Sequence, residues 1–283
     1  STGTYYFAIR INANSTPWYI SFDDFQITTT GPASTSTLSS GVGAEPSTVS
    51  SLVNTQGASS LNFDFKFTDD GVTPATDATA SQISQIVFSQ GTGNTITTWS
   101  DAILGAELND GTNSMTGTIN ASNITFSSIS NSSGQLGYIA DNAEKTYTLK
   151  IWLKTTLGGS LPTTIDGQNF VFQVTNSSFT FSSGGLTTGQ SVNSGSSNNV
   201  VDVTATKLVF QSSKPPATAT CNTNFNVSVD AVDANGNRDL LASNSVTLAV
   251  ASGTGILSSS TGLTRNLSSG TYAWTDVKYT PGE

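Results

Sequence analysis

Residues 61–67 read Leu-Asn-Phe-Asp-Phe-Lys-Phe, and this stretch decides the fold class. Large apolar side chains occupy every second position and polar side chains the positions between them. This period of two is typical of a β-strand with one buried face. Residues 146–154, Thr-Tyr-Thr-Leu-Lys-Ile-Trp-Leu-Lys, repeat the pattern. The alternation predicts a sandwich of β-sheets.

The rest of the chain repeats the same signals at short intervals. Runs rich in β-branched and aromatic residues are separated by turns of Ser, Asn, Asp and Gly. One stretch, residues 98–108, has a helix-like composition. The fold class predicted is therefore all-β, as tandem β-sandwich domains. Further strands are expected at 5–11, 18–27, 83–88, 119–126, 137–140, 170–174, 179–181, 200–210, 225–232, 246–249 and 272–279.

Two Ser-, Thr- and Gly-rich stretches, 28–60 and 182–199, are typical of connectors. They divide the chain into a first unit at 1–30, a β-sandwich domain with an N-terminal linker at 31–199, and a last domain at 200–283. Strand-like sequence runs close to both ends. We therefore expect the natural polypeptide to be longer and the last domain to be truncated.

Composition excludes several classes of function. Charged residues make up 10% of the chain and the net charge is −9, which argues against binding to nucleic acid. The sequence contains no histidine, so Ser-His and Cys-His catalytic pairs are ruled out, and we expect no enzyme activity. A lone cysteine, Cys221, is expected to be a partly buried core residue. No apolar stretch in the sequence is long enough to span a membrane.

Two groups of aspartates are candidate calcium ligands, because hard cations favour clustered carboxylate oxygens. The first group is Asp69, Asp70 and Asp77, and the second is Asp23 and Asp24. A solvated turn is the alternative for the first group and an acidic pair at a strand edge is the alternative for the second. No other cofactor is expected.

A third oxygen-rich stretch, residues 230–239, has two interpretations. Its Asp and Asn side chains are able to bind calcium between domains, but they are also the residues that a tight hairpin requires. Asn235-Gly236 predicts a type I′ turn, in which both central residues have positive φ. Among the tryptophans, Trp152 is the best candidate for stacking on a sugar, with core packing as the alternative.

Two segments resemble known families. Residues 18–27, Trp-Tyr-Ile-Ser-Phe-Asp-Asp-Phe-Gln-Ile, are similar to the closing strands of MAM-like and choice-of-anchor jelly-roll domains. Residues 206–210 (Thr-Lys-Leu-Val-Phe), the Asp-Ala-Asn-Gly-Asn motif at 233–237 and Val-Thr-Leu at 246–248 resemble a bacterial immunoglobulin-like repeat.

This combination resembles the giant secreted adhesins of gliding Bacteroidota that use the type IX export route. The resemblance implies an extracellular, cell-surface stalk segment that projects a distal binding region for adhesion or gliding. Its expected partners are neighbouring domains of the same polypeptide, surface polysaccharide or like subunits. The alternatives are a carbohydrate-binding module of a secreted enzyme and a self-assembling fibre subunit.

Overall fold

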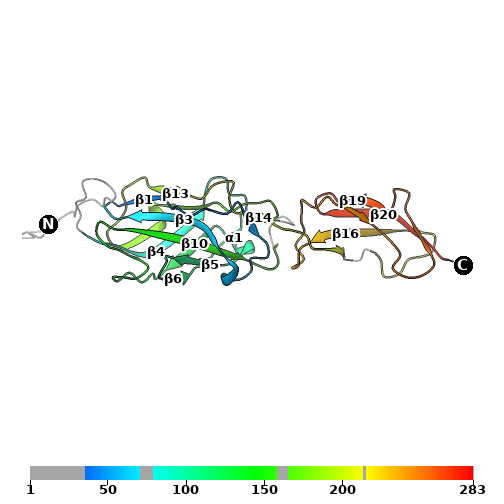
Figure 1. Ribbon diagram of the computed structural model, residues 1–283, viewed down its shortest axis with the longest axis horizontal. Helices are drawn as coiled ribbons and strands as arrows, with labels where there is room; N and C mark the ends of the chain where they lie inside the picture. Colours follow the sequence, from blue (N-terminus) through cyan, green and yellow to red (C-terminus); the bar gives the residue numbers. More distant parts are fainter. Residues whose placement is uncertain (1–35, 71–78, 158–164, 213–214, 283) are drawn as a thin grey trace, which may run out of the picture.

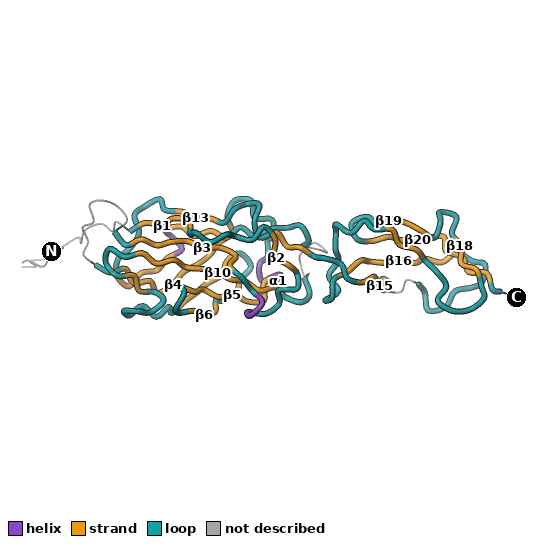
Figure 2. Tube along the Cα trace, viewed as in Figure 1, coloured by secondary structure: helices purple, strands orange, loops and turns teal. Residues whose placement is uncertain are grey.

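The computed structural model describes residues 36–70, 79–157, 165–212 and 215–282. These residues form two β-sandwiches placed one after the other along the long axis of the molecule (Figure 1). Strands and loops make up almost all of the described chain (Figure 2). The all-β fold class predicted from the sequence is confirmed.

The first sandwich packs a five-stranded sheet on a seven-stranded sheet. The five-stranded sheet has the order β1 (Thr37–Ser40), β3 (Leu61–Thr68), β10 (Glu144–Leu153), β5 (Ile103–Asn109), β6 (Ser114–Thr116). The other has the path β13 (Ser191–Asn193), β11 (Phe172–Thr175), β4 (Ser81–Gln90), β8 (Asn123–Ser127), β7 (Thr118–Ile119), with β12 (Phe179–Ser183) and β9 (Tyr138–Ile139) also paired to β4.

Short elements complete this domain. A separate parallel pair joins β2 (Thr48–Ser50) to β14 (Val200–Asp202). The helices are η1 (Gln56–Ala58), α1 (Trp99–Ala102) and η2 (Asn176–Ser178). The helix-like stretch predicted at 98–108 is therefore helical only over its first turn, and its second half is the strand β5.

Aromatic side chains from the two sheets meet edge to face in the core. Phe63 of β3 contacts Phe88 of β4, with 6.1 Å between ring centroids, and Phe65 contacts Phe179 of β12 at 5.8 Å. All four rings are buried. Edge-to-face pairs of this kind contribute about 0.5–1.5 kcal/mol each beyond the area that they bury. The alternation at 61–67 thus supplies the centre of the sandwich.

The polar side of β3 is also buried, contrary to the simple alternation. The Asn62 side chain accepts a hydrogen bond from the Ile151 amide (2.8 Å) and donates to Asn199 (3.1 Å). Asp64 accepts a hydrogen bond from the Gly43 amide (2.8 Å). Asn62 is the extra residue of a bulge in β3. The partners of the two side chains lie on β10, at Asn199 and in the loop after β1, which a period of two in the sequence does not reveal.

Both predicted connectors belong in part to the sandwich. Leu38 of β1 and Val49 of β2 are core residues, so residues 36–50 are not a linker. Strand β13 lies within the second connector and extends the larger sheet. The strand expected to begin the last domain, β14, pairs instead with β2, and its Val201 lies in the first core. The boundary therefore falls a few residues later than predicted.

The second sandwich is smaller. One sheet has the order β15 (Lys207–Phe210), β16 (Asn224–Val232), β20 (Thr271–Thr280), β18 (Ile256–Ser258), and the facing sheet pairs β17 (Ser245–Thr247) with β19 (Thr264–Asn266). Trp274 is fully buried between them. Cys221 is exposed, so its expected core position is wrong.

Candidate functional site

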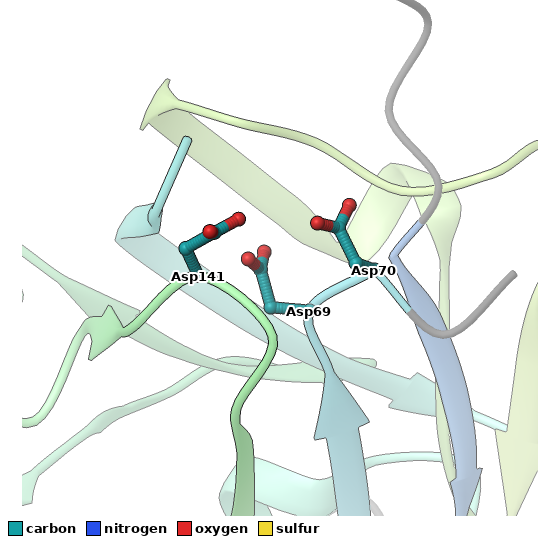
Figure 3. A group of neighbouring side chains, drawn as sticks. All are labelled: Asp69, Asp70 and Asp141. Carbon is teal, nitrogen blue, oxygen red and sulfur yellow. The ribbon is translucent and has the colours of Figure 1, made fainter. Parts of the chain in front are cut away.

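Three aspartate carboxylates gather at the turns that precede β10 and follow β3. One oxygen from each of Asp69, Asp70 and Asp141 lies within 4.8 Å of the other two. Figure 3 shows the three side chains close together, Asp69 between the other two. Asp69 is buried, Asp70 is partly buried and Asp141 is exposed.

The fold explains why these residues meet. Strand β10 pairs with β3 so that Glu144 lies opposite Thr68, and the Asp69 amide donates to the Ala143 carbonyl (2.8 Å). The turn before β10 is thereby held against the end of β3. One oxygen of Asp69 accepts hydrogen bonds from Ser36 (3.0 Å) and Ser81. These contacts fix the orientation of the buried carboxylate.

The structure brings together two of the predicted calcium ligands and adds one that the sequence did not suggest. Asp69 and Asp70 lie in the cluster, whereas Asp77, Asp23 and Asp24 lie outside the described residues. Asp141 was missed because it stands 71 positions after Asp70, and the pairing of β10 with β3 alone makes them neighbours. Calcium binding here stays a prediction.

Calcium is expected to raise the melting temperature of the first domain if it binds the cluster. Saturation at about 100 times the dissociation constant adds about 2.7 kcal/mol. In a domain of this size that shift corresponds to about 5–10 °C. Differential scanning calorimetry with calcium, magnesium or chelator measures it. We expect Asp141→Asn to lose the shift and Asp101→Asn, which lies outside the cluster, to keep it. An unchanged wild-type melting temperature would contradict the prediction.

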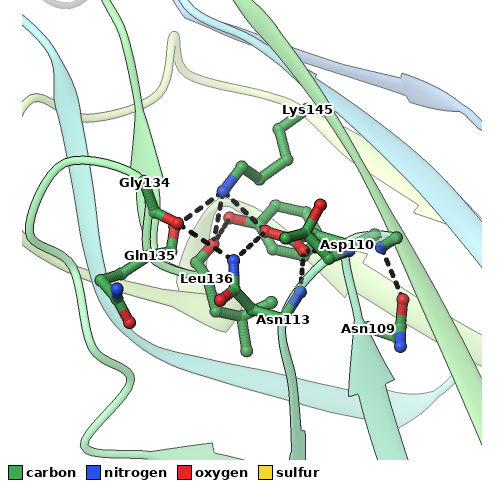
Figure 4. A network of polar contacts seen from close by, with 10 residues as sticks. Asn109, Asp110, Asn113, Gly134, Gln135, Leu136 and Lys145 are labelled. Carbon is green, nitrogen blue, oxygen red and sulfur yellow. Dashed lines mark hydrogen bonds and ion pairs between the residues drawn. The ribbon is translucent and has the colours of Figure 1, made fainter.

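A second polar cluster fastens the β5–β6 turn to β10 (Figure 4). The Lys145 ammonium lies 2.8 Å from an Asp110 oxygen and donates to the carbonyls of Gln135 (2.8 Å) and Leu136 (3.1 Å). Burial alone would raise the pKa of the Asp110 carboxyl, but hydrogen bonds from Lys145 and from the Asn113 amide lower it below its ordinary value. Both charges are well partnered, as in a structural ion pair.

The loop 233–237 of the second domain is bound to the first domain. The Asn237 side chain accepts a hydrogen bond from the Leu157 amide (2.9 Å) and donates to the Thr155 carbonyl (3.0 Å). Ser51 donates to the Asp233 carboxylate at 2.7 Å. Burial opposes ionisation of Asp233, but the hydrogen bonds from Ser51 and Asn237 bring its pKa below the usual value. These residues form a joint between domains.

The turn in this loop differs from the predicted type I′. The Gly236 amide donates to the Asp233 carbonyl (3.2 Å), so the tight turn is centred one residue earlier than expected. Gly236 has positive φ (94°), but Asn235 does not. This geometry is that of a three-residue hairpin loop with glycine at the bulge. The hairpin interpretation of the oxygen-rich stretch thus agrees with the contacts observed.

One buried carboxylate, that of Asp166, links the connecting segment to the second domain. Its two oxygens accept hydrogen bonds from the amides of Val203 (2.9 Å) and Leu240 (2.7 Å). Asp239 binds the Ala205 amide (3.0 Å) in the same way. Four residues separate β14 from β15, and these contacts fix two of them. The connection is therefore short and held on both sides.

Burial raises the pKa of Asp166, and the neighbouring charges of Asp239 and Asp202 act in the same direction. The two backbone amides act in the opposite direction. The site is thus a junction of acidic side chains that bind amides across a domain boundary.

Among the described tryptophans, Trp152 alone is not buried in a core. Trp99 and Trp274 are buried core residues. Trp152 is partly exposed, but its ring covers Gly105 on the neighbouring strand so closely that a Cβ there would overlap it. Trp18 lies outside the described residues.

Comparisons with known proteins returned no significant similarity to any family model, any curated protein or any solved structure. Within the described ranges, no helix is both long and apolar enough to cross a membrane.

Proposed function

We propose that this chain is a structural stalk segment of a large secreted cell-surface adhesin or filament. One observation supports the proposal above the others: two sandwiches follow each other along one axis, and the joint between them is short and hydrogen-bonded (Figure 1). A joint of this kind keeps successive domains aligned. A binding region carried beyond them would be held away from the cell.

The chemistry of the joint favours alignment over free rotation. Asn237 and Asp233 bind backbone and side-chain groups of the first domain, while Asp166 of the first domain binds a backbone amide of the second. Each domain therefore supplies polar groups whose partners lie in the other. Rotation at the joint would leave several of these groups unpaired, at a cost of about 1–3 kcal/mol for each one that stays buried.

The location is part of the proposal. The surface is polar through Ser, Thr and Asn more than through charge, and the resemblance to adhesin domains favours a bacterial surface protein exported by the type IX route for adhesion or gliding. A carbohydrate-binding module of a secreted enzyme is the second candidate, and partly exposed Trp152 is the observation that favours it.

Single-molecule stretching between the chain ends tests the stalk proposal. We expect two discrete unfolding events, one for each sandwich, at forces well above those that straighten an unfolded chain. Domains that give way at the force of linker extension would contradict a load-bearing role. A glycan array run in parallel distinguishes the second candidate, because sugar binding that disappears in Trp152→Ala would favour it over the stalk.

A further inference from the structure

The second sandwich is open along one side. Leu208 and Phe210 of β15 lie opposite Ala231 and Val229 of β16, two buried core residues. Directly opposed residues of antiparallel strands point to the same face of a sheet. Leu208 and Phe210 therefore point toward the core side, yet they are 53% and 58% exposed. The facing sheet does not extend far enough to cover them.

A groove follows this open side. It consists of two adjoining hollows of about 110 and 550 Å³, and both are lined by Leu208 of β15 and Val246 of β17. The ring of Trp274 contributes to the smaller hollow. Strands β15 and β17 are edge strands of the two facing sheets within the described chain. The groove thus lies between two sheet edges.

Hydrogen-bonding groups point out of both edges. The Gln211 amide donates to the Ser228 carbonyl (2.9 Å), so alternation directs the backbone groups of Leu208 and Phe210 away from β16. The Leu248 amide donates to the Leu263 carbonyl (3.0 Å). By the same alternation, the backbone amides and carbonyls of Ser245 and Thr247 point away from β19. The same side of the domain therefore exposes both apolar side chains and unpaired backbone groups of the strand edges, as do surfaces that bind an additional β-strand.

We propose that this side of the second domain binds a second copy of the chain. The two copies are related by a two-fold axis, with β15 antiparallel to β15 and β17 beside β17. Centred on Val209, the pairing places Leu208 opposite Phe210 of the second copy, so that their outward amides and carbonyls bond reciprocally. The two open cores then close on each other. This inference goes beyond the stalk function and does not depend on it.

The placement of charge favours the antiparallel arrangement over a parallel one. Lys207 lies opposite Gln211 of the second copy, so the two lysines sit at opposite ends of the pair. A parallel arrangement would place them side by side, where like charges repel. Two-fold symmetry is the commonest for self-association because one self-complementary patch is enough. The antiparallel orientation also sends the two first domains in opposite directions.

Sedimentation equilibrium and light scattering of the whole chain, from about 1 µM to about 1 mM, test the proposal. We expect the mass to rise to that of a dimer. Leu208→Lys places a charge in the contact and is expected to weaken the dimer about 100-fold. Phe210→Pro removes one outward amide at an edge where proline is tolerated and should act similarly. Leu241→Lys, at a residue that is 76% exposed and outside the groove, is the matched control.

Circular dichroism and thermal melting establish that each variant is folded. A chain that stays monomeric over the whole range overturns the proposal, and so does a dimer that persists in folded Leu208→Lys. Hydrogen exchange tests the other possible occupant of the groove, a segment of the same chain. Slow exchange of the Leu208 and Phe210 amides in a monomer would show that another segment of the same chain fills the groove, and it would equally overturn binding by a second copy.

Discussion

Trp274→Ala is expected to destabilise the second sandwich by about 3–5 kcal/mol. The indole is fully buried, packs edge-on against Tyr272 with 4.7 Å between ring centroids, and donates from Nε1 to the Gly262 carbonyl (3.1 Å). A domain of about this size has a total stability of about 4–12 kcal/mol. The loss therefore removes a large fraction of the domain's free energy of unfolding. Urea unfolding followed by near-ultraviolet circular dichroism measures it.

Trp152→Ala is the matched control, because Trp152 is partly exposed and belongs to the first domain. We expect a smaller loss, confined to the transition of that domain. If Trp274→Ala shifted the unfolding midpoint no more than Trp152→Ala, the indole would not be the centre of the second core.

Asp166→Ala is expected to loosen the joint between the domains. The substitution leaves the amides of Val203 and Leu240 without their acceptor, which costs about 1–3 kcal/mol for each amide that remains buried. The remaining contacts of Asn237 and Asp233 hold one side of the joint only. Small-angle X-ray scattering should therefore show a broader distribution of interatomic distances, and calorimetry should show two transitions that are further apart.

Asp202→Ala tests whether any loss of acidic charge has the same effect. Asp202 lies beside the joint, and its carboxylate accepts a hydrogen bond from Thr204, a residue of the same connecting segment, at 3.2 Å. We expect its scattering profile to match that of the wild type. Equal broadening in both variants would mean that charge, and not the two amide contacts, sets the alignment.

The sequence predicted features that depend on neighbouring residues, but not features that depend on pairing between distant residues. Alternation predicted β3 and β10, because the period of two is set by residues within one strand. It did not predict that Asn62 would be buried, since its partners lie 89 and 137 positions away. Leu38 and Val49 are isolated apolar residues in polar sequence, so their strands resembled a linker.

The candidate sites show the same limit. Clustered acidic residues pointed to Asp69 and Asp70, but Asp141 joins them through strand pairing alone. The motif at 233–237 indicated a hairpin, and its second role appeared only when the first domain was seen to bind Asn237 and Asp233. Partners that belong to another domain leave no mark in the local sequence.

The parallel pairing of β2 with β14 determines how the first domain would fail under tension. Strand β2 stands near the start of the described chain, and β14 leads into the second domain. Once β1 has been pulled away, tension would draw β2 backward and β14 forward. Parallel strands loaded at opposite ends slide past each other in shear, so bonds such as those from Ser51 to Asp202 (2.9 Å) and from Val200 to Ser47 (3.0 Å) share the load. They must break together, whereas a hairpin pulled from its open end unzips one bond at a time.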